Sequence, residues 1–409
     1  MQTNVYEKVQ NERRRQLKTI AYTGYSLLIF IFYGGKYMLD EMGPEAVTLE
    51  YILLLLAYAC LGIKILMTPY TKKEAACGLG IMALAALCFA YNRNEYLITN
   101  VILVFSLKDI DLEELFRWCF WVGFVTVAAT IMASFELGTA GGYSAVDRNW
   151  TDMRYKFGYS TPNTCHMYLW RLMMLYIFGY YSRIRLPHIV VMMALNILMF
   201  QFTGSRTGVL GAMLLVFYLT FIKVAEPIAC KRWFGIVLSL VFVIWGMLIC
   251  YLVLEMQYTD IFVKLDKILT RRLSMAAARV EWKPVSLFGN QYISDYNYID
   301  CGWISMLLQW GVIWFVIYNI AMIGLILKST RERRPQVAMM VFVTGIYGFG
   351  ESSVMEKGVA AIVIFLIAEL LYRRSVKEQP ACKDVRRNPG VGSDAQNVKA
   401  VGASIASQS

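Results

Sequence analysis

The stretch QFTGSRTGVLGA, residues 201–212, joins two almost wholly apolar segments and contains a single charged residue, Arg206. An arginine beside hydrocarbon is costly, and at a helix start it also opposes the positive end of the helix dipole. Both costs fall when an anion sits between the guanidinium and the free backbone N–H groups of the helix start. The stretch therefore predicts a turn that binds a phosphorylated lipid, with Thr203 or Ser205 capping the following helix. The alternative is that Arg206 only reaches ordinary phospholipid headgroups.

Three further side chains are candidates for acid–base chemistry or sugar contacts. Glu351 follows a predicted span, where a carboxyl in a dry site could accept a proton from a hydroxyl group. Asp300 and His166 are expected on the same side of the membrane. A helix cap is the alternative role for Glu351, and packing is the alternative for His166. Asn163 would shape a helix start or bind sugar hydroxyls.

The composition indicates the class of protein that positions these residues. Of the 409 residues, 58% are hydrophobic and 14% aromatic, more than one soluble core needs. Much of the net charge of +11 lies at the ends: residues 1–18 hold five Lys/Arg and two Glu, and residues 373–409 hold seven Lys/Arg and three acids. Basic ends favour contact with anionic membrane lipids. They leave no separate basic domain to bind nucleic acid.

Apolar stretches of spanning length predict an all-α, polytopic integral membrane helical bundle of about twelve transmembrane helices. The predicted spans are about 20–39, 47–67, 75–91, 95–108, 115–135, 164–182, 187–203, 205–224, 233–255, 300–327, 336–350 and 357–372. The first is expected to be an uncleaved span. Residues 1–19 then form a basic cytoplasmic arm, residues 20–372 the membrane domain, and residues 373–409 a disordered cytoplasmic tail.

Lysines and arginines fall in alternate connections, which fixes the expected orientation. If every span crosses, one side receives Arg13-Arg14-Arg15, Lys72-Lys73, Arg183/Arg185, Lys231-Arg232, Arg331/Arg333/Arg334 and Arg373-Arg374. That side is predicted to be the cytoplasm, with both termini there. The two longest loops, about 136–163 and 256–299, then lie outside the cytoplasm.

Loop 256–299 has a helical pattern of its own. Ile261, Leu265 and Leu273 recur at helical spacing, while Lys264 and Lys267 fall on another face. This pattern predicts a helix lying in the outer headgroup layer.

No metal or cofactor is expected. The nine cysteines form no Cys-x-x-Cys pair and the chain has two histidines, so a zinc or redox centre is poorly supported. Asp109-Ile110-Asp111 resembles a nucleotide-sugar metal motif, but Asp111 with Glu114 fits a helix capping box better. Asp40-Glu41 lies in a loop too short for an acidic catalytic site.

Four segments in order resemble bacterial polysaccharide polymerases of the Wzy type and their O-antigen ligase relatives. They are RYKFGYSTPNT at 154–164, TGSRTGVLG at 203–211, AARVEWKPVSLFG at 277–289 and DYNYIDCGWISMLLQWGVIWFVIY at 295–318. The resemblance covers about 154–360. The chain departs from the family pattern at Cys301-Gly302, which follows Asp300.

The resemblance implies a GT-C-like fold and a metal-independent glycosyltransferase on the outer face of the bacterial cytoplasmic membrane. It would join oligosaccharide repeat units carried on undecaprenyl pyrophosphate into capsular, exo- or O-antigen polysaccharide. Arg154, Arg206 and Arg279 carry over as ligands of the pyrophosphate, whose charge arginines can meet without a metal. Asn163, Ser205 and Thr207 are further substrate-binding candidates. Arg154 could instead be a surface charge, and Arg279 an anchor of the interfacial helix.

Two other functions remain open at this point. A flippase or another transporter for lipid-linked units could also have about twelve spans, although its functional charges should lie near the midplane. An O-antigen-type ligase, which transfers finished glycan to another acceptor, shares nearly all these features. Expected partners are the lipid-linked donor and acceptor, membrane lipids, chain-length regulators and flippases.

Overall fold

The computed structural model describes residues 2–141, 143–144, 153–257, 259–269, 271–291, 299–352, 355 and 362–372. These residues belong to one compact unit, Met1–Arg374. They are helical apart from connecting segments and one short antiparallel pair, β1 (Tyr143–Ser144) with β2 (Met153–Arg154). The expected helical fold is therefore confirmed for the described part of the chain. The predicted disordered tail, 373–409, lies outside it.

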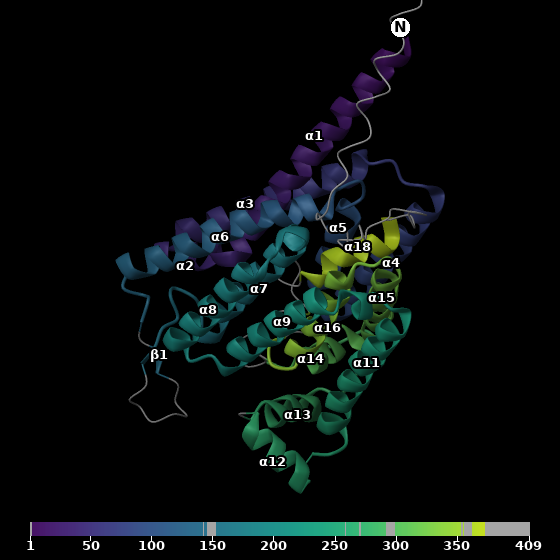
Figure 1. Ribbon diagram of the computed structural model, residues 1–409. Helices are drawn as coiled ribbons and strands as arrows, with labels where there is room; N and C mark the ends of the chain where they lie inside the picture. The colour runs from purple at the N-terminus through teal and green to yellow at the C-terminus, as the bar shows by residue number, and fades with distance from the viewer. Residues whose placement is uncertain are drawn as a thin grey trace, which may run out of the picture. The chain divides into compact units, whose positions relative to one another are not determined.

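Helices occupy the predicted spans in chain order (Figure 1). The first half contains α1 (Gln2–Phe30), the π-helical η1 (Ile31–Gly35), α2 (Lys36–Met42), α3 (Pro44–Met67), α4 (Lys72–Asn92), α5 (Tyr96–Ser106), α6 (Leu112–Glu136), α7 (Pro162–Tyr180), η2 (Tyr181–Arg183) and α8 (Leu186–Thr203). The second half contains α9 (Arg206–Val224), α10 (Glu226–Ala229), α11 (Arg232–Leu254), α12 (Asp260–Ile268), α13 (Arg272–Trp282), α14 (Gly302–Gln309), α15 (Gly311–Arg331), α16 (Pro335–Tyr347) and α18 (Val363–Tyr372).

Seven of the described helices are long and apolar enough to cross a membrane. They are α3, α4, α6, α8, α9, α11 and α15. Between 17% and 39% of the apolar window in each is buried, so most of these side chains face outward, as expected for contact with lipid. The chain is thus a multi-pass helical membrane protein by length and composition. Twelve crossings remain a prediction.

The helix ends gather at two opposite ends of the bundle. We call the end where α1 begins the arm end: there Lys18 pairs with Glu114 at the start of α6, 2.6 Å apart, and Arg334 pairs with Glu113. Asp111 caps α6 through the backbone N–H groups of residues 113 and 114, which confirms the predicted cap. In a capping box the Glu114 side chain would also accept a bond from the Asp111 N–H. Among the described contacts, the Glu114 carboxylate binds Lys18 instead.

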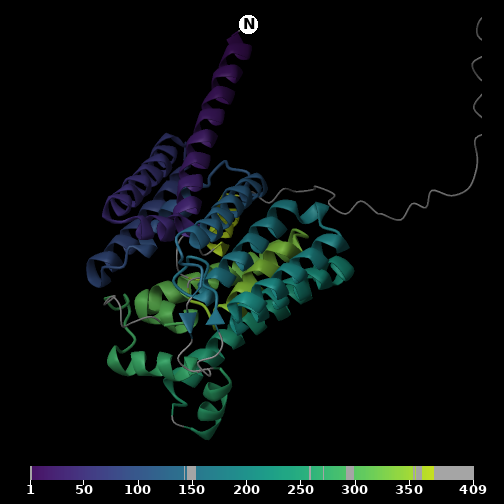
Figure 2. The same cartoon turned by 90° about the vertical axis from the view of Figure 1, so that its left-hand side faces the viewer.

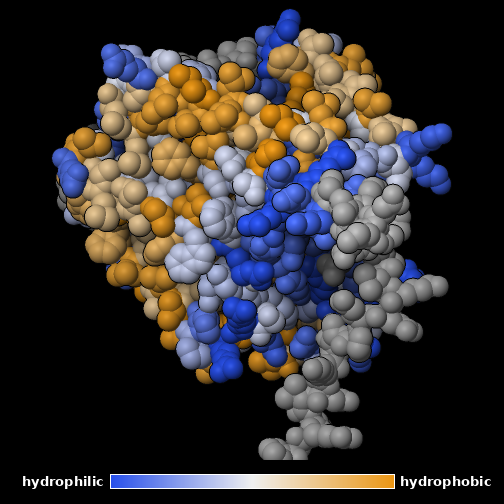
Figure 3. All heavy atoms as spheres, turned by 90° about the horizontal axis from the view of Figure 1, so that it is seen from above, coloured by the Kyte–Doolittle hydropathy of each residue, from blue (hydrophilic) through white to orange (hydrophobic). Residues whose placement is uncertain are grey.

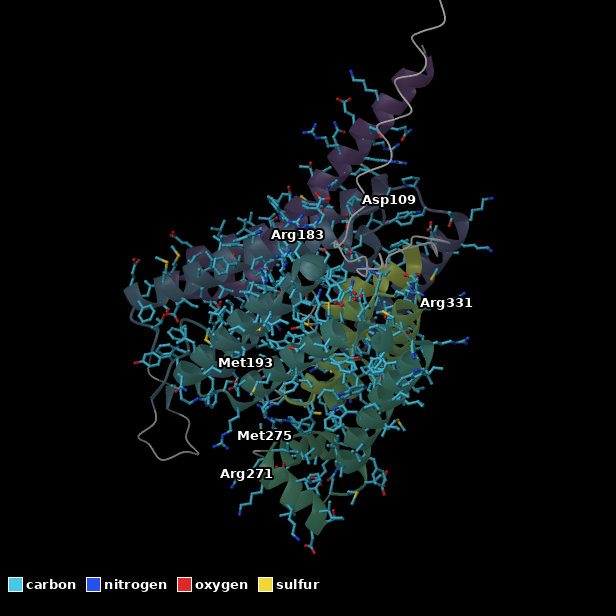
Figure 4. All side chains as sticks on the ribbon, viewed as in Figure 1. Asp109, Arg183, Met193, Arg271, Met275 and Arg331 are labelled. Carbon is cyan, nitrogen blue, oxygen red and sulfur yellow. The ribbon has the colours of Figure 1, made fainter. Side chains whose placement is uncertain are left out.

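The opposite end, which we call the loop end, carries β1, β2, α12, α13 and the turn between α8 and α9 (Figure 1). Asp109, Arg183 and Arg331 lie toward the arm end, whereas Arg271 and Met275 lie at the loop end (Figure 4). At the arm end α1 runs on beyond the other helices (Figure 2). Seen from there, hydrophilic side chains gather over one part of the face, with hydrophobic ones around them (Figure 3).

The predicted single span 300–327 is wrong, because two helices occupy it. α14 ends at Gln309 and α15 begins at Gly311, whose φ is +81°. The segment before α14 fills the break: Val312 and Ile313 donate to the carbonyls of residues 286 and 287, and Asn290 donates to Leu308. This backbone pairing replaces helical bonds that a continuous helix would have made.

The predicted single interfacial helix is also wrong. Asp260–Ile268 and Arg272–Trp282 are separate helices, divided at Arg271 with φ +64°. The carboxylate of Asp266 stabilises this turn, because it accepts hydrogen bonds from the backbone N–H groups of Leu273 and Ser274 at the start of α13. The second helix, α13, packs against α11 and α14 and buries one face in the bundle.

Candidate functional site

The turn between α8 and α9 has the geometry that the sequence predicts. Gly204 adopts φ +56°, which closes α8 through a bond from its N–H to the Phe200 carbonyl. Ser205 is the cap of α9, accepting a hydrogen bond from Gly208 N–H at 3.1 Å. Thr203 Oγ1 accepts a bond from the Ser205 N–H. The turn is therefore preformed by its own residues.

Arg154 lies directly against this turn. Its Nε donates to the Thr203 carbonyl at 2.6 Å and its Nη2 donates to Asn163 Oδ1 at 3.1 Å. Tyr155, the residue after β2, donates its N–H to the Phe202 carbonyl, which holds the end of β2 beside α8. Two candidates that are far apart in sequence, Arg154 and the turn, thus meet at the loop end.

Arg206 begins α9, and its side chain is exposed. Among the described residues its guanidinium has no hydrogen-bond or ion-pair partner. An arginine in this state keeps its five donors available to a ligand. Of the three arginines that the sequence singled out, Arg206 is thus the one whose surroundings least restrict it.

His166 is fully buried, and the protein engages both of its ring nitrogens. Nδ1 lies 3.1 Å from Thr203 Oγ1, and Nε2 lies 2.8 Å from Asn196 Oδ1. Asn196 in turn donates to the Val209 carbonyl on α9. This arrangement ties α7, α8 and α9 together. It favours the packing role and leaves no ring nitrogen facing a substrate.

Arg272, at the start of α13, lies between the two candidate acids Asp300 and Glu351, and we call these three residues the charged cluster. The sequence did not single out Arg272. Its side chain is 6% exposed. Its Nη1 donates to the Gly350 carbonyl, and its Nη2 donates to Thr207 Oγ1 at 3.3 Å. Its Nε lies 3.6 Å from Asp300 Oδ2, and Nη2 lies 4.0 Å from Glu351 Oε1. Three predicted site residues therefore meet on one guanidinium.

The two carboxyl groups lie in different surroundings. Glu351 is 4% exposed, in the connection that follows α16. Asp300 precedes α14 and lies outside the seven spanning helices. Burial raises the pKa of Asp300 above its ordinary value, and the Arg272 guanidinium opposes that rise. Arg272 is therefore the cation beside both acids, of which Glu351 is buried and Asp300 is partly exposed.

Arg279 lies on the same helix but contacts a different group. Its guanidinium sits 6.0 Å from the centre of the Trp282 ring, and the side chain is partly exposed. Seven residues separate it from Arg272, so the two share roughly one helix face. The contact with Trp282 supports a role for Arg279 as an anchor of the helix at least as well as a role as a pyrophosphate ligand.

The signal that could have revealed Arg272 is the break at residue 271. Once α13 is taken to start at 272, its buried residues are Arg272, Leu273, Ala276 and Ala277, which form one helical face. A continuous helix from 260 hides that pattern. The sequence-based prediction failed here because the cap from Asp266 crosses six residues, beyond the usual capping-box spacing.

Within the described residues, no three His, Cys, Asp or Glu side chains form a group that could hold a metal ion. Asp300 and Glu351 both face the Arg272 guanidinium, and the ring nitrogens of His166 face the Thr203 hydroxyl and the Asn196 amide. No family model, curated protein or solved structure matches the chain.

Proposed function

We propose that the protein polymerises oligosaccharide repeat units carried on undecaprenyl pyrophosphate, on the outer face of the bacterial cytoplasmic membrane. The observation that carries the proposal is the presence, at the loop end, of both an exposed arginine on a helix start and two acids that share one guanidinium, the buried Glu351 and the partly exposed Asp300. Thr207 joins the two parts, because it follows Arg206 on α9 and contacts Arg272. An anion site and a base site then adjoin one another.

The first half of the proposed reaction concerns the leaving group. The growing chain is bonded to its lipid carrier through the anomeric carbon, and that bond breaks with its electron pair moving to the pyrophosphate oxygen. Arg206 and the N–H groups at the start of α9 would meet the developing negative charge. Arg154 would hold the turn in place and add positive charge beside it. Arg279, on α13, is the third candidate cation.

The second half concerns the nucleophile. A terminal hydroxyl of the next lipid-linked repeat unit attacks the anomeric carbon, forming the new glycosidic bond. Its proton would pass to Glu351 or Asp300. Asn163 and Ser205, beside the turn, are suited to contact sugar hydroxyls or phosphate oxygens. Each step uses side chains and backbone N–H groups of this protein together with its two lipid-linked substrates.

Replacing Arg206 by alanine tests the proposal in the native host. Loss of a charge-assisted contact to the leaving group should abolish long polymer, and single repeat units should accumulate on the lipid carrier. The measurements are polymer length on gels and mass spectrometry of extracted lipid-linked sugars. Arg183→Ala is the matched control, since Arg183 is also exposed but lies toward the arm end.

Three outcomes decide between functions. Normal chain lengths in the Arg206→Ala strain, at normal protein abundance, would contradict the proposal. Repeat units trapped facing the cytoplasm would favour the flippase. Full-length polymer that accumulates on the lipid carrier, and is not passed to another acceptor, would favour the ligase.

A further inference from the structure

Arg272 joins four separate parts of the chain. It lies on α13, and its contacts are Thr207 on α9, Asp300 before α14, and the connection after α16 that contains Gly350 and Glu351. There is little room to vary this contact: a Cβ built on Gly350 would lie 2.5 Å from Arg272 Nη1. The guanidinium is thus a fixed part of the packing at the loop end.

The donors of this guanidinium are largely committed. An arginine has five N–H donors, and all three nitrogens of Arg272 already face protein oxygens. A buried arginine that left these partners to bind a ligand would leave the buried Glu351 and the partly exposed Asp300 without their cation, which is unfavourable. Arg206, in contrast, is exposed and can bind an anion at no such cost.

We propose that Arg272 is a positioning residue, which holds Asp300 and Glu351 side by side and fixes them to α9, and that it does not itself bind the lipid pyrophosphate. Anion binding falls to Arg206. This division of roles rests on the proposed function, because it assigns separate tasks to the two arginines within that reaction.

The charges of the cluster are consistent with a base site. Two carboxylates and one guanidinium leave one net negative charge, so one carboxylate can accept a proton while the other remains paired. Arg272 from α13 faces both acids, and Thr207 from α9 contacts the same guanidinium. Burial raises the pKa of Asp300, and the neighbouring Arg272 guanidinium opposes part of that rise.

Binding of undecaprenyl pyrophosphate to the purified full-length protein tests the first half of the proposal. Arg206→Gln should weaken binding about tenfold or more, because one charge-assisted contact is lost. Arg272→Lys should bind the same lipid within about twofold of wild type, since lysine keeps the net charge of the cluster unchanged. Equal loss of binding in both variants would overturn the inference.

Turnover tests the second half. The substrate is a lipid extract from cells that lack the protein. On this substrate Arg272→Lys should lower kcat about 100-fold with little change in KM, because the acids are displaced. Arg206→Gln should raise KM as well as lower kcat. An Arg272→Lys enzyme with wild-type kcat would also overturn the inference.

The pH profile separates positioning from simple support of the fold. In Arg272→Gln the acids lose their cation, so the acidic limb of the kcat profile should move up by about one to three pH units. Loss of folding would lower activity equally at every pH. If Arg272→Gln does not fold, the double variant Arg272→Gln/Glu351→Gln restores charge balance and should fold, bind undecaprenyl pyrophosphate and remain inactive.

Failure of the inference can be told from failure of the proposed function. If wild-type protein makes no polymer from the extract and does not bind undecaprenyl pyrophosphate, polymerisation itself is wrong. If wild type does both and Arg272→Lys loses lipid binding as severely as Arg206→Gln, the function stands and Arg272 is a pyrophosphate ligand.

Discussion

Arg154, Arg206 and Arg272 carry the same charge in different surroundings. Arg154 donates to a backbone carbonyl and an asparagine at the turn, Arg272 is buried among acids, and Arg206 is exposed. Because a guanidinium has a fixed number of donors, contacts within the protein limit what it can offer a ligand. The surroundings of each arginine, more than its charge, therefore suggest its role.

Asp300 gives a prediction with a definite sign. Burial raises its pKa, so the folded protein binds this proton more tightly than the unfolded chain does. Its contribution to stability is therefore fully present below the ordinary pKa of aspartate, about 4, and is lost as the pH rises through the higher folded value. Asp300→Asn should melt at a temperature equal to or above that of wild type at pH 7.

The difference between Asp300→Asn and wild type should shrink as the pH falls toward about 4, where the wild-type carboxyl is itself neutral. Thermal unfolding of the detergent-solubilised protein at several pH values measures it. Asp260→Asn, at an exposed position on α12, is the control. A variant that is less stable than wild type at pH 7, yet equal to it in acid, would show that the Arg272 contact outweighs burial.

At the scale of elements, the break between α14 and α15 decides where Asp300 lies. In a continuous helix over 300–327, residue 300 would lie on the axis of α15, displaced by about 1.5 Å for each residue before Gly311. The break lets α14 lie within the loop end, where Gly302 N–H donates to the Gly348 carbonyl. Asp300 is thereby held next to the connection that contains Glu351.

Gly311 makes this break possible, and its replacement by alanine tests it. Its φ is +81°, and an added Cβ would lie 2.3 Å from the backbone nitrogen of Gly289. Gly311→Ala should therefore lower the free energy of unfolding by about 1–3 kcal/mol. Gly324→Ala on α15 is the matched control: its nearest neighbour is 3.6 Å away, so it should gain about 0.5–1 kcal/mol.

Chemical denaturation or thermal melting of the two glycine variants, side by side, is the measurement. Activity of Gly311→Ala per folded molecule should fall as well, since α14 positions Asp300. Similar melting of both variants would mean that the chain tolerates a helix without this break.

At the scale of the whole described unit, the charged connections separate into an arm end and a loop end. Asp109, Arg183 and Arg331 lie toward one, and Arg271 and Met275 lie at the other (Figure 4). The positive-inside rule predicts that the arm end faces the cytoplasm. The candidate site would then face outward, where lipid-linked repeat units are joined in the proposed reaction.

Labelling of single cysteines in intact cells tests this orientation. Arg271→Cys should react with a membrane-impermeant maleimide in whole cells, whereas Asp109→Cys should react only after permeabilisation. The exposed native Cys77 is replaced by serine in both variants to lower the background. Labelling of Asp109→Cys alone in intact cells would place the site in the cytoplasm and contradict the proposed function.

The sequence by itself determined the helical class, the positions of most helices and the cap at Asp111, and it narrowed the cap of α9 to Thr203 or Ser205. It did so because these features depend on local hydropathy, dipole and turn chemistry. It also named Arg154, Asn163 and the 203–205 turn as candidates, Arg154 through the family resemblance.

Only the tertiary structure decided which side chains meet. Arg272 lies 65 residues from Thr207 and 78 from Gly350 along the chain, and its contacts depend on the breaks at Arg271 and Gly311. Those breaks are held by Asp266 and by the segment 286–290, which no short pattern connects to them. Burial and pairing arise from such distant contacts, so the sequence revealed the exposed Arg206 but not the buried Arg272.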